Sequence, residues 1–168
     1  TLKLSENGYD VLLVAPTGGG KTLAGFLPSL NDLINNKPKK NKLHTLYISP
    51  LKALTIDVHR NLTSPIEDQG LDIRVETRTG DTSAYKKNKQ KVLPPHMLMT
   101  TPESLALLLS NKESKDYFKD LKYLVIDEIH TLVNTKRGDL LSLNLSRINS
   151  ISPDCKKIGL SATVKNKN

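Results

Sequence analysis

The sequence predicts an α/β fold: a mostly parallel sheet with helices on both faces, in three layers. Short apolar runs alternate along the chain with longer amphipathic segments. Several of these runs are apolar at nearly every position, as strands that are covered on both faces must be. Alternating strands and helices form β-α-β units with right-handed crossovers, and such units build a parallel sheet.

Six segments are expected to be strands because each is apolar and too short for a helix. They are residues 10–15, 43–49, 71–77, 97–101, 121–127 and 157–161. Four segments have the length or period of helices: residues 21–35, 52–69, 102–110 and 139–149. The Lys- and Asn-rich segments 35–42 and 86–91 are expected to be exposed connections or polar helix ends. No repeat or linker divides the chain, so residues 1–168 are expected to form a single domain.

The composition narrows the class of partner. Lys and Arg number 25 against 17 Asp and Glu, a net charge of +8. This balance favours polyanions, because each neutralised phosphate releases counterions, although a solvated lysine-rich surface explains the charge equally well. The single cysteine, Cys155, excludes an internal disulfide and a Cys-based zinc site, and it indicates a cytoplasmic, intracellular setting. No apolar run reaches the roughly 18 residues that cross a membrane, so no membrane partner is expected.

Residues 15–22 read Ala-Pro-Thr-Gly-Gly-Gly-Lys-Thr and lie between a predicted strand and a predicted helix, as a P-loop requires. The glycines allow a tight turn whose N–H groups face phosphate oxygens, and the helix start adds free N–H groups. Lys21 would reach the β- and γ-phosphates, and the Thr22 hydroxyl would bind Mg²⁺. The motif therefore predicts ATP or GTP binding. The predicted nucleotide-binding residues are Ala15, Thr17, Gly18, Gly19, Gly20, Lys21 and Thr22.

Two carboxylates, Asp127 and Glu128, end the apolar run that begins at Tyr123. Ligands of such sheets sit beyond the carboxyl ends of the strands, so both side chains are expected near the P-loop. Asp127 would hold Mg²⁺, and Glu128 would orient and deprotonate the water that attacks the γ-phosphate. Capping of the next helix is the simpler alternative. His130 has no second His or Cys at ligand spacing, so a metal role is rejected.

Together these motifs resemble those of superfamily 2 helicases, in which the P-loop begins with Ala and the acidic motif is a DEAD/DEAH box. Residues 49–54 (SPLKAL) resemble motif Ia, 79–82 (TGDT) the short T-G-D signature, and 100–105 (TTPESL) motif Ib. Ser161-Ala162-Thr163 is similar to the third motif. The resemblance implies nucleic-acid contacts at Pro50, Leu51, Lys52, Thr79, Gly80, Asp81, Thr100, Thr101, Pro102 and Glu103. It implies a coupling role for His130, Ser161, Ala162 and Thr163.

Within that superfamily, the stretches TTPESL, VIDEIH, TKRGDLLSL and GLSATV look most like the large helicase-related (Lhr) family. The resemblance implies a RecA-like P-loop domain that uses ATP and Mg²⁺, with single-stranded DNA or RNA as partner. It also implies 3′-to-5′ translocation, a setting in DNA repair, and a second RecA-like domain. The start without Met and the polar end are expected for a fragment that lacks this second domain.

Other P-loop classes fit less well. A GTPase needs an Asn-Lys-x-Asp motif, and residues 111–114 (NKES) lack the Asp. A transporter ATPase needs a Ser-Gly-Gly signature between its nucleotide motifs, and the sequence has none. A nucleic-acid-dependent ATPase that translocates without unwinding stays open as the alternative function. A nucleotide-gated binding module is disfavoured because Lys21, Asp127 and Glu128 are all present.

Overall fold

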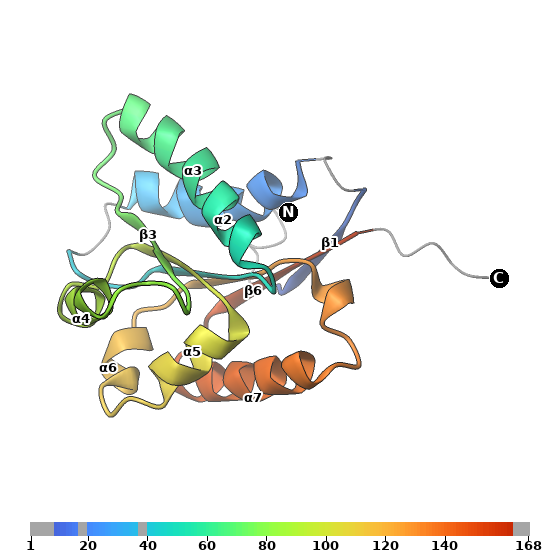
Figure 1. The fold of residues 1–168 in the computed structure, drawn as a ribbon. Helices are drawn as coiled ribbons and strands as arrows, with labels where there is room; N and C mark the ends of the chain where they lie inside the picture. Colours follow the sequence, from blue (N-terminus) through green and yellow to red (C-terminus); the bar gives the residue numbers. More distant parts are fainter. Residues whose placement is uncertain (1–8, 17–19, 37–39, 163–168) are drawn as a thin grey trace.

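A computed structural model describes residues 9–16, 20–36 and 40–162 of the chain. Within them six strands form one sheet in the order β1-β6-β5-β2-β4-β3, and all neighbouring strands are parallel (Figure 1). The strands are β1 (Val11–Val14), β2 (Thr45–Ile48), β3 (Val75–Arg78), β4 (Met97–Thr100), β5 (Tyr123–Ile126) and β6 (Lys156–Ser161). The predicted α/β fold with a parallel sheet is confirmed.

Helices cover both faces of the sheet and create two separate cores (Figure 1). Strand β2 shows why: Leu46 and Ile48 point into one core and Tyr47 into the other, because successive side chains alternate across a strand. One face carries α2 (Lys21–Asn35) and α3 (Lys52–Asp68). The other face carries α5 (Pro102–Leu109), α6 (Ser114–Phe118) and α7 (Lys136–Ile151). The remaining helices are α4 (Ala84–Val92) and the short 3₁₀ helix η1 (Ile129–Thr131).

The strand order divides the carboxyl edge of the sheet into two halves. Strands β1, β6 and β5 are neighbours, and they lead into the P-loop, the third motif and the acidic motif. Strands β2, β4 and β3 are also neighbours, and they lead into motif Ia, motif Ib and the T-G-D turn. Six motifs that are scattered along the sequence therefore lie in two adjacent groups.

Helices α6 and η1 are absent from the sequence prediction, and three further elements differ from it by more than two residues or in type. Strand β3 begins at Val75 and not at residue 71, because the backbone N–H of Leu71 is engaged in the turn after α3, where it donates to the Ile66 carbonyl. Helix α7 begins three residues before residue 139, because Thr135 caps it by accepting from the Gly138 N–H. Helix α4 occupies a segment that was expected to be a connection or a polar helix end.

Helix α4 had no apolar stripe to reveal it, because Gln90 is its only buried residue. It begins instead with a Ser83 cap that accepts from the Lys86 N–H. In the described part of the chain, no helix is both long enough and apolar enough to cross a membrane.

Candidate functional site

The P-loop lysine is buried without a hydrogen-bond partner. Gly20 adopts a left-handed conformation (φ +70°) and caps α2, whose first two residues are Lys21 and Thr22. The Lys21 side chain is only 6% exposed, and its Nζ makes no hydrogen bond to any described residue. A buried ammonium group without acceptors is costly. The oxygens of a bound phosphate would supply the missing acceptors, so this lysine fits the predicted phosphate contact. Thr17, Gly18 and Gly19 lie outside the described residues.

Asp127 is the most tightly held carboxylate of the site. It is 3% exposed and immediately follows β5. Its Oδ2 accepts from Tyr47 Oη at 2.7 Å and from Thr22 Oγ1 at 3.4 Å, while its Oδ1 accepts from the Glu128 N–H at 2.8 Å. Burial raises the pKa of Tyr47 well above its usual range, so the phenol keeps its proton and donates it. Asp127 and the Thr22 hydroxyl are oxygen donors of the kind that Mg²⁺ prefers.

Glu128 is turned toward the P-loop by its backbone. It adopts the left-handed region (φ +50°, ψ 40°), which costs a non-glycine residue on the order of 1 kcal/mol and is typical of functional sites. One oxygen, Oε1, lies 3.9 Å from Lys21 Nζ. The other, Oε2, lies 3.2 Å from His130 Nε2. The carboxylate therefore faces the P-loop lysine on one side and the following histidine on the other.

His130 connects this carboxylate to the third motif. Its Nδ1 accepts from the Ala162 N–H at 3.2 Å and lies 3.3 Å from Ser161 Oγ. Because Nδ1 accepts a hydrogen bond, the ring proton must be on Nε2, where it faces Glu128. A continuous chain of contacts thus runs from Lys21 through Glu128 and His130 to the end of β6. Thr163, the last residue of the predicted motif, lies outside the described residues.

The P-loop joins the same arrangement through its backbone. The N–H of Ala15 donates to the Ser161 carbonyl at 3.2 Å, which ties the start of the P-loop to the third motif. Beside these groups lies a cavity of about 430 Å³, lined by residues of α2 and α3 and by both carboxylates, Asp127 and Glu128. Its volume lies within the usual range for small-molecule sites. The P-loop, the acidic motif and the cavity therefore form one site.

The predicted nucleic-acid contacts lie in a row on the other half of the edge. Pro50, Thr79, Thr100, Thr101 and Pro102 are buried, whereas Leu51, Lys52, Gly80, Asp81 and Glu103 are exposed. Lys52 Nζ contacts both oxygens of Asp81 at 2.9 Å, so motif Ia and the T-G-D turn are joined directly. The T-G-D turn is closed by two hydrogen bonds of its own: the Thr82 N–H donates to the Thr79 carbonyl, and the Thr79 N–H donates to Thr82 Oγ1.

Two residues of motif Ib already make contacts within the protein. Thr100 Oγ1 donates to the Arg78 carbonyl at 2.7 Å and is fully buried, so its hydroxyl is not free for a ligand. Glu103 forms a two-pronged ion pair with Arg137 of α7, at 2.5 and 3.1 Å. Arg137 lowers the pKa of the Glu103 carboxyl, first through these hydrogen bonds. Glu103 thus anchors the start of α5 to α7.

Sequence reasoning missed two contributors to the site. Tyr47 lies within an apolar strand, where an aromatic residue indicates only a core position. Arg137 lies on a helix and is separated from Glu103 by 34 residues, so no local spacing could pair them. The facing register of β2 and β5 is what brings Tyr47 to Asp127, since Tyr47 pairs with Val125.

A parallel sheet, a P-loop and a carboxylate pair at its edge define the class of RecA-like P-loop domains. The family model of the DEAD/DEAH box helicases matches residues 1–168. The chain belongs to this family.

Its relatives are helicases of the Lhr type. It is 44% identical to the ATP-dependent helicase Lhr-Core protein 2 of Thermococcus barophilus, over 95% of this chain and 20% of that protein. It is 39% identical to the Lhr helicase/uracil glycosylase of Escherichia coli, over 98% of this chain and 12% of that protein. The chain thus spans about a fifth or less of the length of these relatives.

Solved structures of helicases are also similar to this chain. Mycobacterium smegmatis helicase Lhr, bound to ssDNA and AMP-PNP, has a TM-score of 0.85 and 38% identity, over 98% of this chain and 22% of that one. The DEAD-box helicase Mss116, bound to ssRNA and UDP-BeF, has a TM-score of 0.86 and 27% identity, over 98% of this chain and 34% of that one.

Proposed function

We propose that this chain is the ATP-binding and ATP-hydrolysing motor domain of a superfamily 2 helicase, which couples hydrolysis to movement along, or unwinding of, nucleic acid. One observation supports this most strongly. The motifs proposed to bind the nucleotide lie on one half of the carboxyl edge of the sheet, and those proposed to bind nucleic acid (motif Ia, the T-G-D turn and motif Ib) lie on the adjacent half. A motor domain that couples ATP hydrolysis to movement needs its nucleotide site and its nucleic-acid site on one rigid domain.

In this proposal, Lys21 binds the β- and γ-phosphates, and Thr22 and Asp127 hold Mg²⁺. When bound, Mg²⁺ would neutralise charge on the phosphate oxygens. Glu128 accepts a proton from the attacking water as the water oxygen bonds to the γ-phosphorus and the bond to the β-phosphate oxygen breaks. His130 holds Glu128 in place from the side of the third motif. Movement of this histidine contact would report the state of the nucleotide to Ser161 and its neighbours.

The partner is a single strand of DNA or RNA, held along motif Ia, the T-G-D turn and motif Ib. Backbone N–H groups at these turns suit phosphate oxygens and read no bases, as a translocating motor requires. Structures of similar helicases with ssDNA or ssRNA support this assignment. We place residues 1–168 in one domain that works with a second RecA-like domain, in the reducing interior of the cell where a lone Cys155 stays unpaired.

Two variants test the chemistry in the full-length protein. Lys21→Ala should abolish ATP binding, because it removes the buried cation that is proposed to bind the β- and γ-phosphates. Glu128→Gln should keep ATP binding and lower hydrolysis by roughly two to four orders of magnitude, since it removes the base. The exposed Glu113 supplies the control variant, Glu113→Gln. Calorimetry and steady-state hydrolysis give the two readouts. Near-normal turnover of Glu128→Gln would contradict the assignment of Glu128 as the base.

A strand-displacement assay on the full-length protein separates unwinding from translocation without unwinding.

A further inference from the structure

Helix α4 lies at the outer edge of the sheet, next to the T-G-D turn. It therefore extends the row of loops that are proposed to contact nucleic acid. Strand β3 is the outermost strand on that side, and α4 packs against it. The helix follows the T-G-D turn directly, with Ser83 as its cap. Lys87 of α4 donates from Nζ to the Gly80 carbonyl at 3.1 Å, and Gln90 donates to the Thr77 carbonyl at 3.0 Å. These two bonds fix the helix to the turn and to β3.

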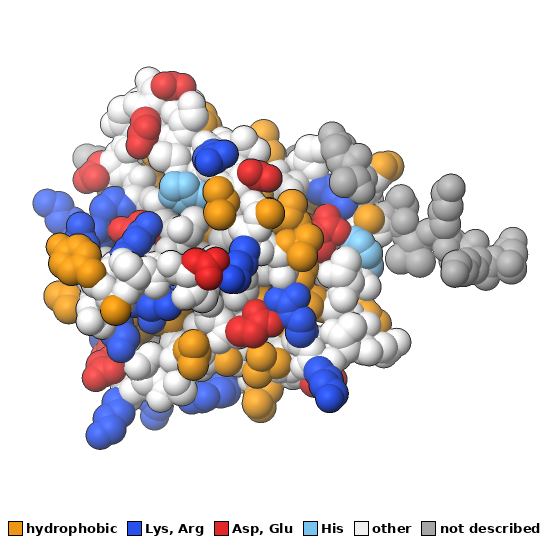
Figure 2. All heavy atoms as spheres, viewed as in Figure 1, with side chains coloured by type: hydrophobic (Ala, Val, Ile, Leu, Met, Phe, Trp, Pro, Cys, Tyr) orange, Lys and Arg blue, Asp and Glu red, His pale blue; other side chains and the backbone are white. Residues whose placement is uncertain are grey.

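The charge of α4 is entirely positive. Its nine residues, AYKKNKQKV, include four lysines and no carboxylate. None of these lysines takes part in an ion pair among the described residues. Figure 2 shows basic side chains gathered at the side of the molecule where α4 lies. Lysines without ion-pair partners, next to a surface proposed to bind nucleic acid, give this side a positive charge that complements a polyanion.

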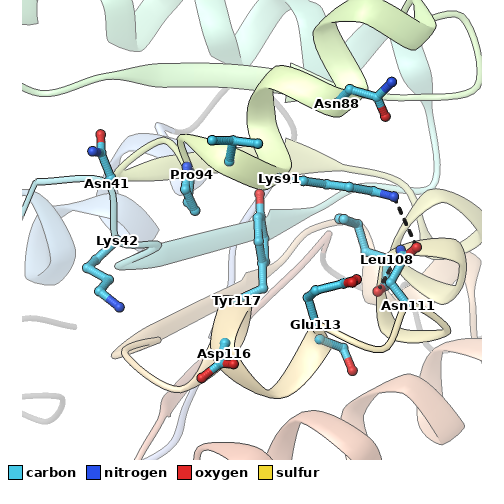
Figure 3. A pocket seen from close by; sticks show the side chains of 12 residues that line it. Asn41, Lys42, Asn88, Lys91, Pro94, Leu108, Asn111, Glu113, Asp116 and Tyr117 are labelled. Atoms are coloured by element: carbon cyan, nitrogen blue, oxygen red, sulfur yellow. Dashed lines mark hydrogen bonds between the residues drawn. The ribbon is translucent and has the colours of Figure 1, made fainter.

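Two faces of α4 are directed at other parts of the protein. Lys87 faces the T-G-D turn, and Gln90 faces β3. Asn88 and Lys91 line a cavity of about 550 Å³ between α4 and α6, where Lys91 donates to Asn111 Oδ1 at 3.1 Å (Figure 3). The remaining side carries Tyr85, which is 80% exposed, the half-buried Lys86 that follows it, and the exposed Lys89 one turn after Tyr85. At this exposure the Tyr85 ring contributes little to the core, and most of its surface is open to a ligand.

We propose that Tyr85, Lys86 and Lys89 form an additional nucleic-acid contact that extends the strand track past the T-G-D turn. The two lysines would bind consecutive phosphates, and Tyr85 would stack on an unpaired base. Aromatic rings beside basic side chains are the usual means of gripping a single strand without reading its sequence. The inference rests on the proposed function, because the track that it extends is itself proposed.

Binding of labelled single-stranded DNA and RNA to the full-length protein, measured by fluorescence anisotropy across a range of salt concentrations, tests this contact. Lys86→Gln combined with Lys89→Gln should reduce the slope of log K against log salt by about 1.4, because each lost phosphate contact removes about 0.7 for a single strand. Tyr85→Ala should weaken binding of a single strand about fivefold or more. Tyr85→Phe should retain binding, and duplex binding should not depend on Tyr85.

Lys122 supplies the matched control, because it is exposed just before the amino end of β5, at the edge of the sheet opposite the T-G-D turn. Lys122→Gln should leave affinity and salt slope unchanged. Normal binding by the α4 variants, with the slope of the unmodified protein, would overturn the inference and leave the proposed function intact. Absence of binding by the unmodified protein at every salt concentration would overturn both.

Discussion

Asp127 receives its three hydrogen bonds from three different places in the chain. Thr22 comes from α2, Tyr47 from β2, and the third donor is the backbone N–H that follows the carboxylate itself. Three donors fix the direction of both carboxylate oxygens before any ligand arrives. Groups that orient a metal ligand in this way typically affect metal affinity almost as much as the ligand does. Tyr47 is therefore the residue through which β2 can act on the proposed Mg²⁺ site.

Replacing Tyr47 by Phe keeps the ring that packs against Phe26 and removes only the hydroxyl. We expect the Mg²⁺ concentration for half-maximal ATPase activity of the full-length protein to rise by roughly tenfold, because Asp127 loses its shortest hydrogen bond. A magnesium titration of steady-state hydrolysis measures this. Tyr9→Phe, at an exposed position, is the control. An unchanged magnesium requirement in Tyr47→Phe would show that the remaining two donors suffice.

At the residue scale, local motifs predicted the P-loop and the acidic motif because each is a short run whose spacing sets its own geometry. The structure brings Lys21, Asp127 and Glu128 together as that reasoning expected. Tyr47 and Arg137 could not be found in the same way. Their partners lie 80 and 34 residues away, and only the strand register and the packing of α5 on α7 bring them into contact.

At the scale of elements, the start of α7 fixes the position of motif Ib relative to the acidic motif. Arg137 holds Glu103, and Asn144 is buried and donates to the Pro102 carbonyl at 3.0 Å. Both contacts require α7 to begin immediately after the loop that follows η1. Gly138 makes this tight entry possible, because an added Cβ there would overlap the backbone carbonyl of Leu132.

Gly138→Ala should therefore destabilise the protein, although alanine favours helices more than glycine does. We expect the free energy of unfolding to fall by about 1–3 kcal/mol, since a backbone carbonyl cannot move away as a side chain can. Urea denaturation of the domain, monitored by circular dichroism, measures the change. Gly80→Ala is the matched control, because a Cβ there would meet only the end of the Lys52 side chain at 3.6 Å. Equal stability of the two variants would contradict this account of the α7 entry.

The spacing of apolar residues in the sequence predicted the helices and strands that bury an apolar face. It did not predict the elements that bury none. Strands β2, β4 and β5 are buried at every position, and their apolar runs predicted them. Helix α4 buries only Gln90, and the five-residue α6 is shorter than two helical turns. Such elements are held by caps and long-range contacts, which a pattern of apolar residues does not record.

At the scale of the whole molecule, the groups proposed to bind the γ-phosphate and Mg²⁺ all lie at one part of the sheet edge. Lys21 and the proposed Mg²⁺ ligands all belong to the P-loop edge of this sheet. The arginines of the chain are engaged or placed elsewhere. Arg74 donates to the Pro94 carbonyl, Arg78 to the Lys87 carbonyl, Arg147 to the Leu109 carbonyl, and Arg137 to Glu103, while Arg60 is exposed on α3 and does not line the cavity.

Because the proposed site is one-sided, residues 1–168 alone should bind ATP but hydrolyse it very slowly. An arginine from a second domain can increase phosphoryl transfer by about a thousandfold or more, and none of the described arginines is placed to do so. Single-stranded DNA should barely change the turnover of the isolated chain, because no domain closure can follow binding. Joining the second motor domain should raise turnover strongly and make it depend on nucleic acid. Steady-state hydrolysis, with circular dichroism to confirm folding, measures both forms. Robust DNA-stimulated hydrolysis by residues 1–168 alone would contradict the proposal that the chain works as one half of a two-domain motor.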